Sequence, residues 1–326
     1  MSHGTPRHRD VIVKPVVCLV GYALAVTPAI EIPKHFTVWA ASDVHGQLGA
    51  FDRLLAAAGL TDAELRWAAP PATALVVTGD LVDRGPDSIG LVRRVAALRE
   101  QAPESGGMVA ILEGNHEMQV LGGLDGQPDL FTALLTFGGG GTFLNAGMAP
   151  GEWAGMAPAE IADRVDQAAP EFRATLATFA PYARWGDTLL VHGGPVPHQD
   201  LGSFERSADR LWIRSDFFDS QDLFPDADAW TAYRDAGIRR VVFGHTPVDR
   251  PTLCHEGRAL NIDTWRGGQV TLARLDPGRD LASAVFLAEP AEPRAIADAP
   301  VSREDILRFD RELPAIVDAW RSTARS

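Results

Sequence analysis

Short apolar runs alternate along the chain with longer segments that have the apolar and polar spacing of amphipathic helices. The short runs are rich in Val, Ile, Leu and Ala, and they predict β-strands at 36–42, 73–78, 108–113, 187–191, 239–243, 258–263, 269–275 and 283–288. The longer segments predict helices at 48–58, 87–101, 158–180, 226–236 and 302–322. Strands that alternate with helices are typical of layered α/β proteins, which is the fold class that this pattern predicts.

Residues 118–185 interrupt the alternation because they carry few strand signals. We interpret them as a helical insertion over the edge of the sheet, within one catalytic domain that spans 36–288. The glycine run FGGGG at 137–141 is not followed by the Gly-Lys-Ser/Thr of a phosphate-binding P-loop, so we expect a mobile loop there. Residues 289–326 are expected to form a Pro/Ala-rich linker and a C-terminal helix.

Residues 1–35 form an N-terminal extension that fits two structures. Basic residues precede the apolar stretch VVCLVGYALAV at 16–26, as in a short signal peptide, whereas the Val/Ile-rich segment 11–20 also fits one or two extra strands. The apolar stretch is shorter than the roughly 20 residues that span a bilayer, so no stable membrane insertion is expected. We expect a cytoplasmic protein, with export through a signal peptide as the alternative.

The composition is ordinary for a globular protein, but the charge restricts the partners. The 326 residues are 46% hydrophobic and 22% charged, and the net charge is −13. Nucleic-acid binding depends on Lys and Arg that neutralise phosphates, so a nucleic-acid partner is not expected. An anionic substrate would need local positive charge, from clustered arginines or from bound metal. Two cysteines are too few for a disulfide framework.

Residues of the metal-binding type follow five of the predicted strands, mostly beside glycine. In open α/β sheets, binding sites form outside the carboxyl ends of the strands, and glycine permits the sharp turns that such an edge requires. The side-chain set of Asp, Asn and His suits Mn, Fe or Zn. The five strand ends are Asp43-Val44-His45, Gly79-Asp80, Gly114-Asn115-His116, His192-Gly193-Gly194 and Gly244-His245.

A pair of divalent ions explains this choice of side chains chemically. Two metals about 3.5–4 Å apart can hold one hydroxide between them and polarise a phosphate ester. Metal binding also lowers the pKa of water from about 15.7 to about 7, so that hydroxide is available at neutral pH. Two carboxylates and one hydroxide leave two divalent ions with net positive charge, and Asn115 preserves that charge because it adds no third carboxylate.

Five motifs in this order resemble those of the calcineurin-like metallophosphoesterases, and more narrowly of the phosphoprotein phosphatase family with its bacterial and Shewanella-like branches. The resemblance covers residues 36–275. It implies a central β-sandwich flanked by helices, in four α/β/β/α layers, with a dinuclear metal site. The motifs are DVHG (43–46), GDLVDRG (79–85), GNHE (114–117), HGG (192–194) and GHT (244–246).

The resemblance implies two divalent ions, with Mn²⁺ expected first and Fe or Zn as alternatives. Asp43 and His45 would bind the first metal, and Asp80 would bridge both. The remaining three ligands would bind the second metal. The complete implied set is Asp43, His45, Asp80, Asn115, His192 and His245.

The same resemblance implies catalytic roles for four further residues. Arg84 in the VDRG segment would clamp the phosphate. His116 would protonate the leaving oxygen, and Asp83 would orient it. A second arginine is expected before the last histidine, where the segment RLWIRSD offers Arg214, with Arg210 nearby as the alternative.

A further strand ends in Asp263 and Thr264, within the segment NIDTW. Bacterial members of the family look similar there. We therefore expect these two residues to orient the metal ligands by hydrogen bonding to them, as residues next to metal ligands commonly do.

Three functions compete for this sequence. The first is a metal-dependent phosphomonoesterase of the serine/threonine protein phosphatase type, which cleaves a phosphorylated protein or small phosphoester by attack of a bridging metal-bound hydroxide. The second is a diadenosine tetraphosphatase-like or other nucleotide phosphohydrolase. Those enzymes typically read DVQG where this chain has DVHG, so His45 favours the phosphatase. The third is a non-catalytic metal-binding adaptor, which would be favoured if a ligand, Arg84 or His116 were missing.

Overall fold

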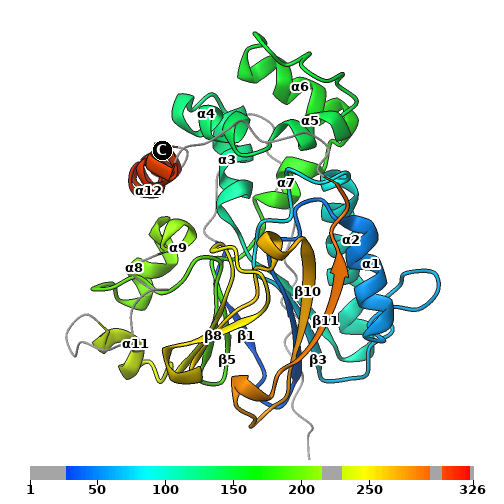
Figure 1. Cartoon of the computed structure of the whole chain (residues 1–326), viewed down its shortest axis with the longest axis vertical. Helices are drawn as coiled ribbons and strands as arrows, with labels where there is room; N and C mark the ends of the chain where they lie inside the picture. The colour runs from blue at the N-terminus through cyan, green and yellow to red at the C-terminus, as the bar shows by residue number, and fades with distance from the viewer. Residues whose placement is uncertain (1–26, 215–229, 294–302, 324–326) are drawn as a thin grey trace, which may run out of the picture.

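The computed structural model describes residues 27–214, 230–293 and 303–323 (Figure 1). The signal peptide or extra strands expected before residue 27 lie outside the described residues. Two further predictions lie partly outside the described residues: the helix expected at 226–236, up to residue 229, and the linker, from residue 294 to residue 302. In the part of the chain that the structure describes, no helix has the length and apolar character needed to cross a membrane.

Two β-sheets form the centre of the molecule (Figure 1). The five-stranded sheet has the order β11-β10-β2-β3-β4, in which β2, β3 and β4 are parallel and β10 runs antiparallel to both β2 and β11. Its strands are β2 (Thr37–Ala41), β3 (Thr73–Val77), β4 (Met108–Ile111), β10 (Gln269–Leu275) and β11 (Val285–Pro290).

The six-stranded sheet has the order β1-β5-β6-β7-β9-β8. β6, β7 and β9 are parallel to one another, so their carboxyl ends share one edge. The strands are β1 (Ile30–Ile32), β5 (Ala183–Trp185), β6 (Thr188–Leu190), β7 (Arg240–Phe243), β8 (Thr252–Cys254) and β9 (Ala259–Asn261). The eight predicted strands are therefore present. The strands β1, β5 and β8 were not predicted.

The alternation of side chains along the strands builds one core between the sheets and one on the outer face of each sheet. Val38 and Ala40 of β2 pack between the sheets, together with Leu190 of β6 and Val242 of β7. Trp39 of β2 points the other way, into the core under the helices. Successive side chains of a strand point to opposite faces, so each central strand contributes to both cores.

Helices cover the outer faces of both sheets, which confirms the predicted layered fold (Figure 1). α1 (Leu48–Ala57) and α2 (Ser88–Gln101) pack on the five-stranded sheet. Side chains of α8 (Leu201–Arg206) and α11 (Thr231–Asp235) share a core with the six-stranded sheet, and α9 (Asp209–Trp212) follows α8. Short 3₁₀ turns lie at Ala102–Ser105, His255–Gly257, Trp265–Gly267 and Leu281–Ser283.

The segment between β4 and β5 contains five helices. The prediction of a single helix at 158–180 is wrong, because one helix ends at Ala168 and a second begins at Phe172. Pro170 lies in the break and cannot donate the backbone hydrogen bond of a continuous helix. The helices are α3 (Asn115–Leu124), α4 (Pro128–Thr136), α5 (Gly140–Asn145), α6 (Pro158–Ala168) and α7 (Phe172–Leu176).

The glycine run at 137–141 forms the turn between α4 and α5 and the first two residues of α5. α5 begins at Gly140, and Gly138 accepts a hydrogen bond from the backbone N–H of Arg84 at 2.9 Å. A Cβ on Gly141 would lie 2.9 Å from that same backbone nitrogen. The glycines therefore allow two backbones to approach closely, which a glycine-rich composition alone does not distinguish from mobility.

The C-terminal helix, α12 (Arg303–Thr323), lies beside α3, α4 and α9 (Figure 1). Phe309, Leu313, Val317 and Trp320 are buried. Their spacing places them along one side of the helix, so α12 is docked against the rest of the molecule.

Candidate metal centre and active site

Parallel strands deliver the predicted ligands to one edge. β2 ends at Ala41 and leads to Asp43 and His45, and its neighbour β3 ends at Val77 and leads to Asp80. The two loops are hydrogen-bonded to each other, because the backbone N–H of His45 donates to the carbonyl of Asp80 at 2.9 Å. Ligands from separate strands therefore lie side by side, held by backbone as well as by packing.

The backbone at this edge adopts an unusual conformation. Asp43, His45, Asp80 and His245 have φ of 51°, 45°, 54° and 61°, in the left-handed region that side chains with a Cβ rarely adopt. Gly79 is in the same region, and a Cβ there would lie 2.7 Å from the backbone nitrogen of Gly114. Such strain of about 1–3 kcal/mol per residue persists where the surrounding structure enforces it, and it concentrates at functional sites.

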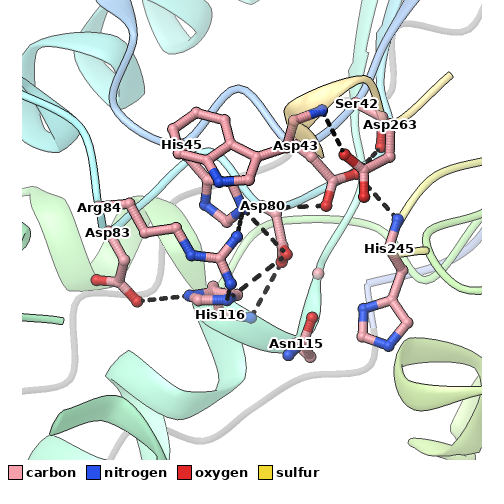
Figure 2. A network of polar contacts seen from close by, with 12 residues as sticks. Ser42, Asp43, His45, Asp80, Asp83, Arg84, Asn115, His116, His245 and Asp263 are labelled. Carbon is pink, nitrogen blue, oxygen red and sulfur yellow. Dashed lines mark hydrogen bonds and ion pairs between the residues drawn. The ribbon is translucent and has the colours of Figure 1, made fainter. Parts of the chain in front are cut away.

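Two clusters of ligand atoms share Asp80. His45, Asp80 and His116 form one cluster (Figure 2), and Asp80, His192 and His245 form the other, each with its ligand atoms within 4.8 Å of one another. Oδ2 of Asp80 lies 3.8 Å from Nε2 of His45, and Oδ1 lies 3.4 Å from Nε2 of His192. The two carboxylate oxygens thus face different clusters, which is the arrangement that a bridging ligand requires.

Asn115 and Asp43 complete the surroundings of the clusters. Oδ1 of Asn115 lies 3.0 Å from Nε2 of His192, beside the second cluster. Oδ1 of Asp43 lies 4.0 Å from Nε2 of His45, and its Oδ2 accepts hydrogen bonds from Ser42 Oγ and, at 3.0 Å, from the backbone N–H of His245. All six predicted ligands therefore lie together, with His116 beside them.

The histidines are oriented in the way that metal ligation needs. Nδ1 of His45 bonds the carbonyl of Val82 and Nδ1 of His192 bonds the carbonyl of Thr78, each at 2.9 Å, so each ring presents Nε2 to the cluster. Burial lowers the pKa of His192 to about 4, which keeps the ring neutral at physiological pH. Nδ1 of His245 lies 3.2 Å from Nε2 of His192, so this nitrogen of the ring faces the second cluster.

Buried carboxylates make the site suitable for cations. Burial raises the pKa of Asp80 well above its usual range, and the charges of Asp43 and Glu117 raise it further. Burial and the charge of Asp43 likewise raise the pKa of Asp263 well above its usual range. Bound divalent cations would offset this desolvation and repulsion, so the donor set fits the two metals that the motifs imply.

Asp83, Arg84 and His116 form a connected group next to the first cluster (Figure 2). Nδ1 of His116 lies 2.8 Å from Oδ2 of Asp83, whose Oδ1 accepts a hydrogen bond from Thr142 Oγ1 at 2.6 Å. The guanidinium of Arg84 reaches Nε2 of both histidines, at 2.6 Å for His45 and 3.1 Å for His116. A planar cation and an oriented imidazole therefore stand beside the shared carboxylate.

The two candidate second arginines lie in different environments. Arg214 donates to the carbonyl of His245, and its Nη2 lies 3.5 Å from Nδ1 of that ring. Arg210 is fully buried, forms an ion pair with Glu113 and donates to the carbonyl of Pro181. Arg214 is thus the arginine that lies against a predicted metal ligand.

Two residues at the site received no role in the sequence analysis. The carboxylate of Glu117 accepts hydrogen bonds from the backbone N–H groups of Asp80, Leu81 and Gly114 at 2.9, 2.7 and 2.8 Å. Its position three residues after Gly114, at the start of α3, is the available signal, because glutamate there is typical of a capping box. Trp265 is the other residue at the site without a predicted role, and its ring centroid lies 5.0 Å from that of His45.

Comparisons with known proteins agree with this geometry. Residues 36–249 match the family profile of calcineurin-like phosphoesterases. The bis(5′-nucleosyl)-tetraphosphatase PrpE [asymmetrical] of Bacillus velezensis is 27% identical over 237 residues, which are 68% of this chain and 82% of that protein. Shewanella-like protein phosphatase 2 of Arabidopsis thaliana is 32% identical over 84 residues, which are 26% of this chain and 21% of that protein.

Among solved structures, the cold-active protein-tyrosine phosphatase of a psychrophilic Shewanella species has a TM-score of 0.51 and 18% identity. The match covers 86% of this chain and 89% of that one. At this identity the likeness concerns the fold, two sheets flanked by helices.

Proposed function

The chain belongs to the calcineurin-like phosphoesterase family of hydrolases that act on phosphate esters, and from this premise we propose a metal-dependent phosphomonoesterase of the serine/threonine protein phosphatase type. One observation carries the proposal. Asp80 belongs to both clusters of potential metal ligands, and Arg84 and His116 lie beside it. This arrangement supports a phosphate-binding cation and a proton donor next to a site for two metals.

The ligands divide into two groups that meet at Asp80. Asp43 and His45 would hold the first ion, and Asn115, His192 and His245 would hold the second. Mn²⁺ is the ion we expect first, with Fe or Zn as alternatives, because the donors mix carboxylate, amide and imidazole. The bound ions would make water acidic enough to supply hydroxide near neutral pH and would polarise the phosphoryl oxygens.

Arg84 and Arg214 supply the charge that binds the phosphate. A guanidinium offers two parallel N–H donors that match two phosphate oxygens, which a lysine does not. Both side chains contact predicted metal ligands, Arg84 at His45 and Arg214 at His245. Together with bound divalent ions, the two arginines would give the site local positive charge although the chain carries a net charge of −13.

His116 is suited to give a proton to the leaving oxygen. Asp83 bonds Nδ1, which fixes the ring and directs Nε2 toward Asp80, 3.9 Å away. Burial and the nearby charge of Arg84 lower the pKa of His116 well below its usual range, so the ring gives up a proton readily once it is protonated, and the adjacent Asp83 carboxylate provides a partner for that protonated form. If Nε2 of His116 bound a metal, it would carry no proton to donate. The roles of proton donor and metal ligand for His116 therefore exclude each other.

A nucleotide phosphohydrolase of the diadenosine tetraphosphatase type is the alternative. It is favoured by the Bacillus velezensis relative, which aligns with 68% of this chain, whereas the Arabidopsis phosphatase aligns with 26%. The phosphatase is favoured by His45, which stands where such nucleotide hydrolases typically have glutamine, and whose ring belongs to the first cluster.

Substrate preference after metal restoration tests the proposal. The protein would be stripped of metal and reloaded with Mn²⁺, and kcat/KM would be measured for phosphoserine and phosphothreonine peptides, nucleotides and diadenosine tetraphosphate. We expect kcat/KM at least about tenfold higher for a phosphopeptide, a difference of about 1.4 kcal/mol in transition-state binding. A clear preference for the dinucleotide would replace the phosphatase proposal with the alternative.

A further inference from the structure

The C-terminal helix α12 touches the candidate active site although it lies outside the segment that matches the family. The family match ends at residue 249, and α12 spans Arg303–Thr323. The helix packs against α3, which begins at Asn115, and against α9, which leads to Arg214. Figure 1 shows α12 next to α4, on the side of α8 and α9. Its position raises the question of what it contributes to the site.

Asp310 of α12 binds Arg214 through one edge of the guanidinium. Nε of Arg214 donates to Oδ2 of Asp310 at 3.0 Å, and the two side chains are 28% and 15% exposed. Nη1 of Arg214 donates to the carbonyl of His245, so the end of the guanidinium that carries Nη1 and Nη2 lies at a predicted metal ligand. Asp310 thus fixes the Nε edge and leaves donors of the opposite end next to the site.

The preceding residue of α12 supports the other arginine. The ring of Phe309 packs edge-to-face on the ring of Phe137, with centroids 5.3 Å apart. The carbonyl of Phe137 accepts a hydrogen bond from Nε of Arg84 at 3.3 Å. Two consecutive residues of α12 therefore support the Nε groups of the two arginines. Asp310 binds Nε of Arg214 directly, and Phe309 packs on Phe137, whose carbonyl binds Nε of Arg84.

The far end of α12 is anchored to the strand that precedes α3. Arg321 binds Glu113 at 2.6 Å, and Arg210 binds the same carboxylate. Glu113 comes immediately before Gly114 and Asn115, at the start of α3. The helix is therefore connected at both ends to the backbone that carries the site.

We infer that α12 is a positioning element of the active site, in which Asp310 holds Arg214, and Phe309 supports the contact of Phe137 with Arg84, in the orientation that binds phosphate. The inference rests on the proposed function, because it takes both arginines to be phosphate ligands. An arginine that is ordered before the phosphate arrives loses less side-chain freedom on binding, so phosphate binds more tightly. The residues of α12 touch the arginines and not the substrate.

A double-mutant cycle with orthophosphate tests the inference. The full chain, loaded with Mn²⁺, would be titrated with orthophosphate by calorimetry as the wild type, D310N, R214A and the double variant. We expect D310N to weaken phosphate binding about three- to tenfold, and we expect the double variant to bind no more weakly than R214A alone. The matched control is E312Q on the same helix, whose side chain is 61% exposed and whose partner Arg308 is 4.0 Å away, and it should bind phosphate like the wild type.

Three results would overturn the inference. D310N could bind phosphate as the wild type does, or more tightly, in which case Asp310 competes for Arg214. The loss caused by D310N could also persist undiminished in the R214A background, in which case Asp310 acts by another route. If D310N does not fold, D310S carries the test, since it also removes the carboxylate: a loss that disappears with R214A supports positioning, and an unchanged affinity contradicts it.

The readout separates this inference from the proposed function. Orthophosphate binding does not require turnover, so a chain that hydrolyses no phosphopeptide would refute the proposed substrate class while the cycle still decides the role of Asp310. Conversely, normal phosphopeptide turnover without coupling between Asp310 and Arg214 would refute the positioning role alone.

Discussion

Asp80 is the residue on which both candidate metal positions depend, because one carboxylate oxygen faces each cluster. We expect D80N to lose most of its affinity for both ions, since a neutral amide cannot bridge two cations as a carboxylate does. Metal per chain, measured by elemental analysis after dialysis, checks this. D83N is the matched control and should keep its metals, because Asp83 contacts His116 and Thr142. Wild-type metal content in D80N would contradict the bridging role.

His116 belongs to the first cluster by distance, yet the proposed function makes it a proton donor. We expect H116N to retain its metals and to lose about 10²–10⁴-fold in kcat, the typical contribution of a general acid. Steady-state kinetics together with metal analysis check both halves of the prediction. A variant that loses metal would make His116 a ligand, and one that keeps full turnover would remove it from the mechanism.

At the residue scale, side chains that follow strands were predictable and side chains that act over long distances were not. Asp43, Asp80 and His245 could be recognised because each comes directly after an apolar run, beside or near glycine. The capping position of Glu117 could be recognised in the sequence, but its bonds to the backbone N–H groups of Asp80 and Leu81, 37 and 36 positions away, could not. Burial alone separates Arg210 from Arg214, and burial is a property of the fold.

At the level of elements, the start of α5 supports the loop that carries Arg84. Gly141 has an ordinary helical backbone, but its Cβ would lie 2.9 Å from the backbone nitrogen of Arg84. We expect G141A to cost about 1–3 kcal/mol in the free energy of unfolding and to weaken orthophosphate binding, because Arg84 must shift. Urea denaturation and calorimetry check the two effects.

G202A in α8 is the control for this variant. A Cβ there meets the end of the flexible Asp200 side chain, 3.3 Å away. This variant should leave phosphate binding unchanged and should change the stability little. Equal effects of the two substitutions on phosphate binding would show that the packing of α5 against Arg84 is unimportant.

The anchor of α12 on β4 is a second element-scale feature. Glu113 binds two arginines, and burial lowers the pKa of Arg321 to about 10 and that of Arg210 well below its usual range. Replacing the carboxylate leaves both buried cations without their counter-charge, so we expect E113Q to lower the free energy of unfolding by about 3–5 kcal/mol. The exposed E312Q should change it by less than about 0.5 kcal/mol. Equal stability of the two variants in urea would contradict the buried network.

The layers of the fold were predictable from the alternation of strands and helices, whereas the exact boundaries depended on local chemistry. Eight strands could be located because each coincides with a segment rich in apolar residues, although β11 leaves Val285 and Phe286 exposed, whereas β1, β5 and β8 were not predicted. Pro170 divides a helix that hydrophobic spacing alone joins. The contact of α12 with the site could not be predicted, because the spacing of its apolar residues predicts a buried face but not the residues against which that face packs.

At the scale of the whole molecule, folding brings metal ligands from 200 positions of sequence to one edge, from Asp43 to His245. A chain with a net charge of −13 thereby surrounds buried carboxylates with histidines and two arginines. The central claim is that this edge holds two divalent ions and that both are needed to hydrolyse a phosphomonoester.

Titration of the metal-free protein with Mn²⁺ tests this claim most directly, with bound metal and phosphomonoester hydrolysis measured at every point. The account predicts that turnover rises in proportion to the chains that carry two ions and levels off at two per chain. Full turnover at one ion per chain, or no turnover when two are bound, would contradict it.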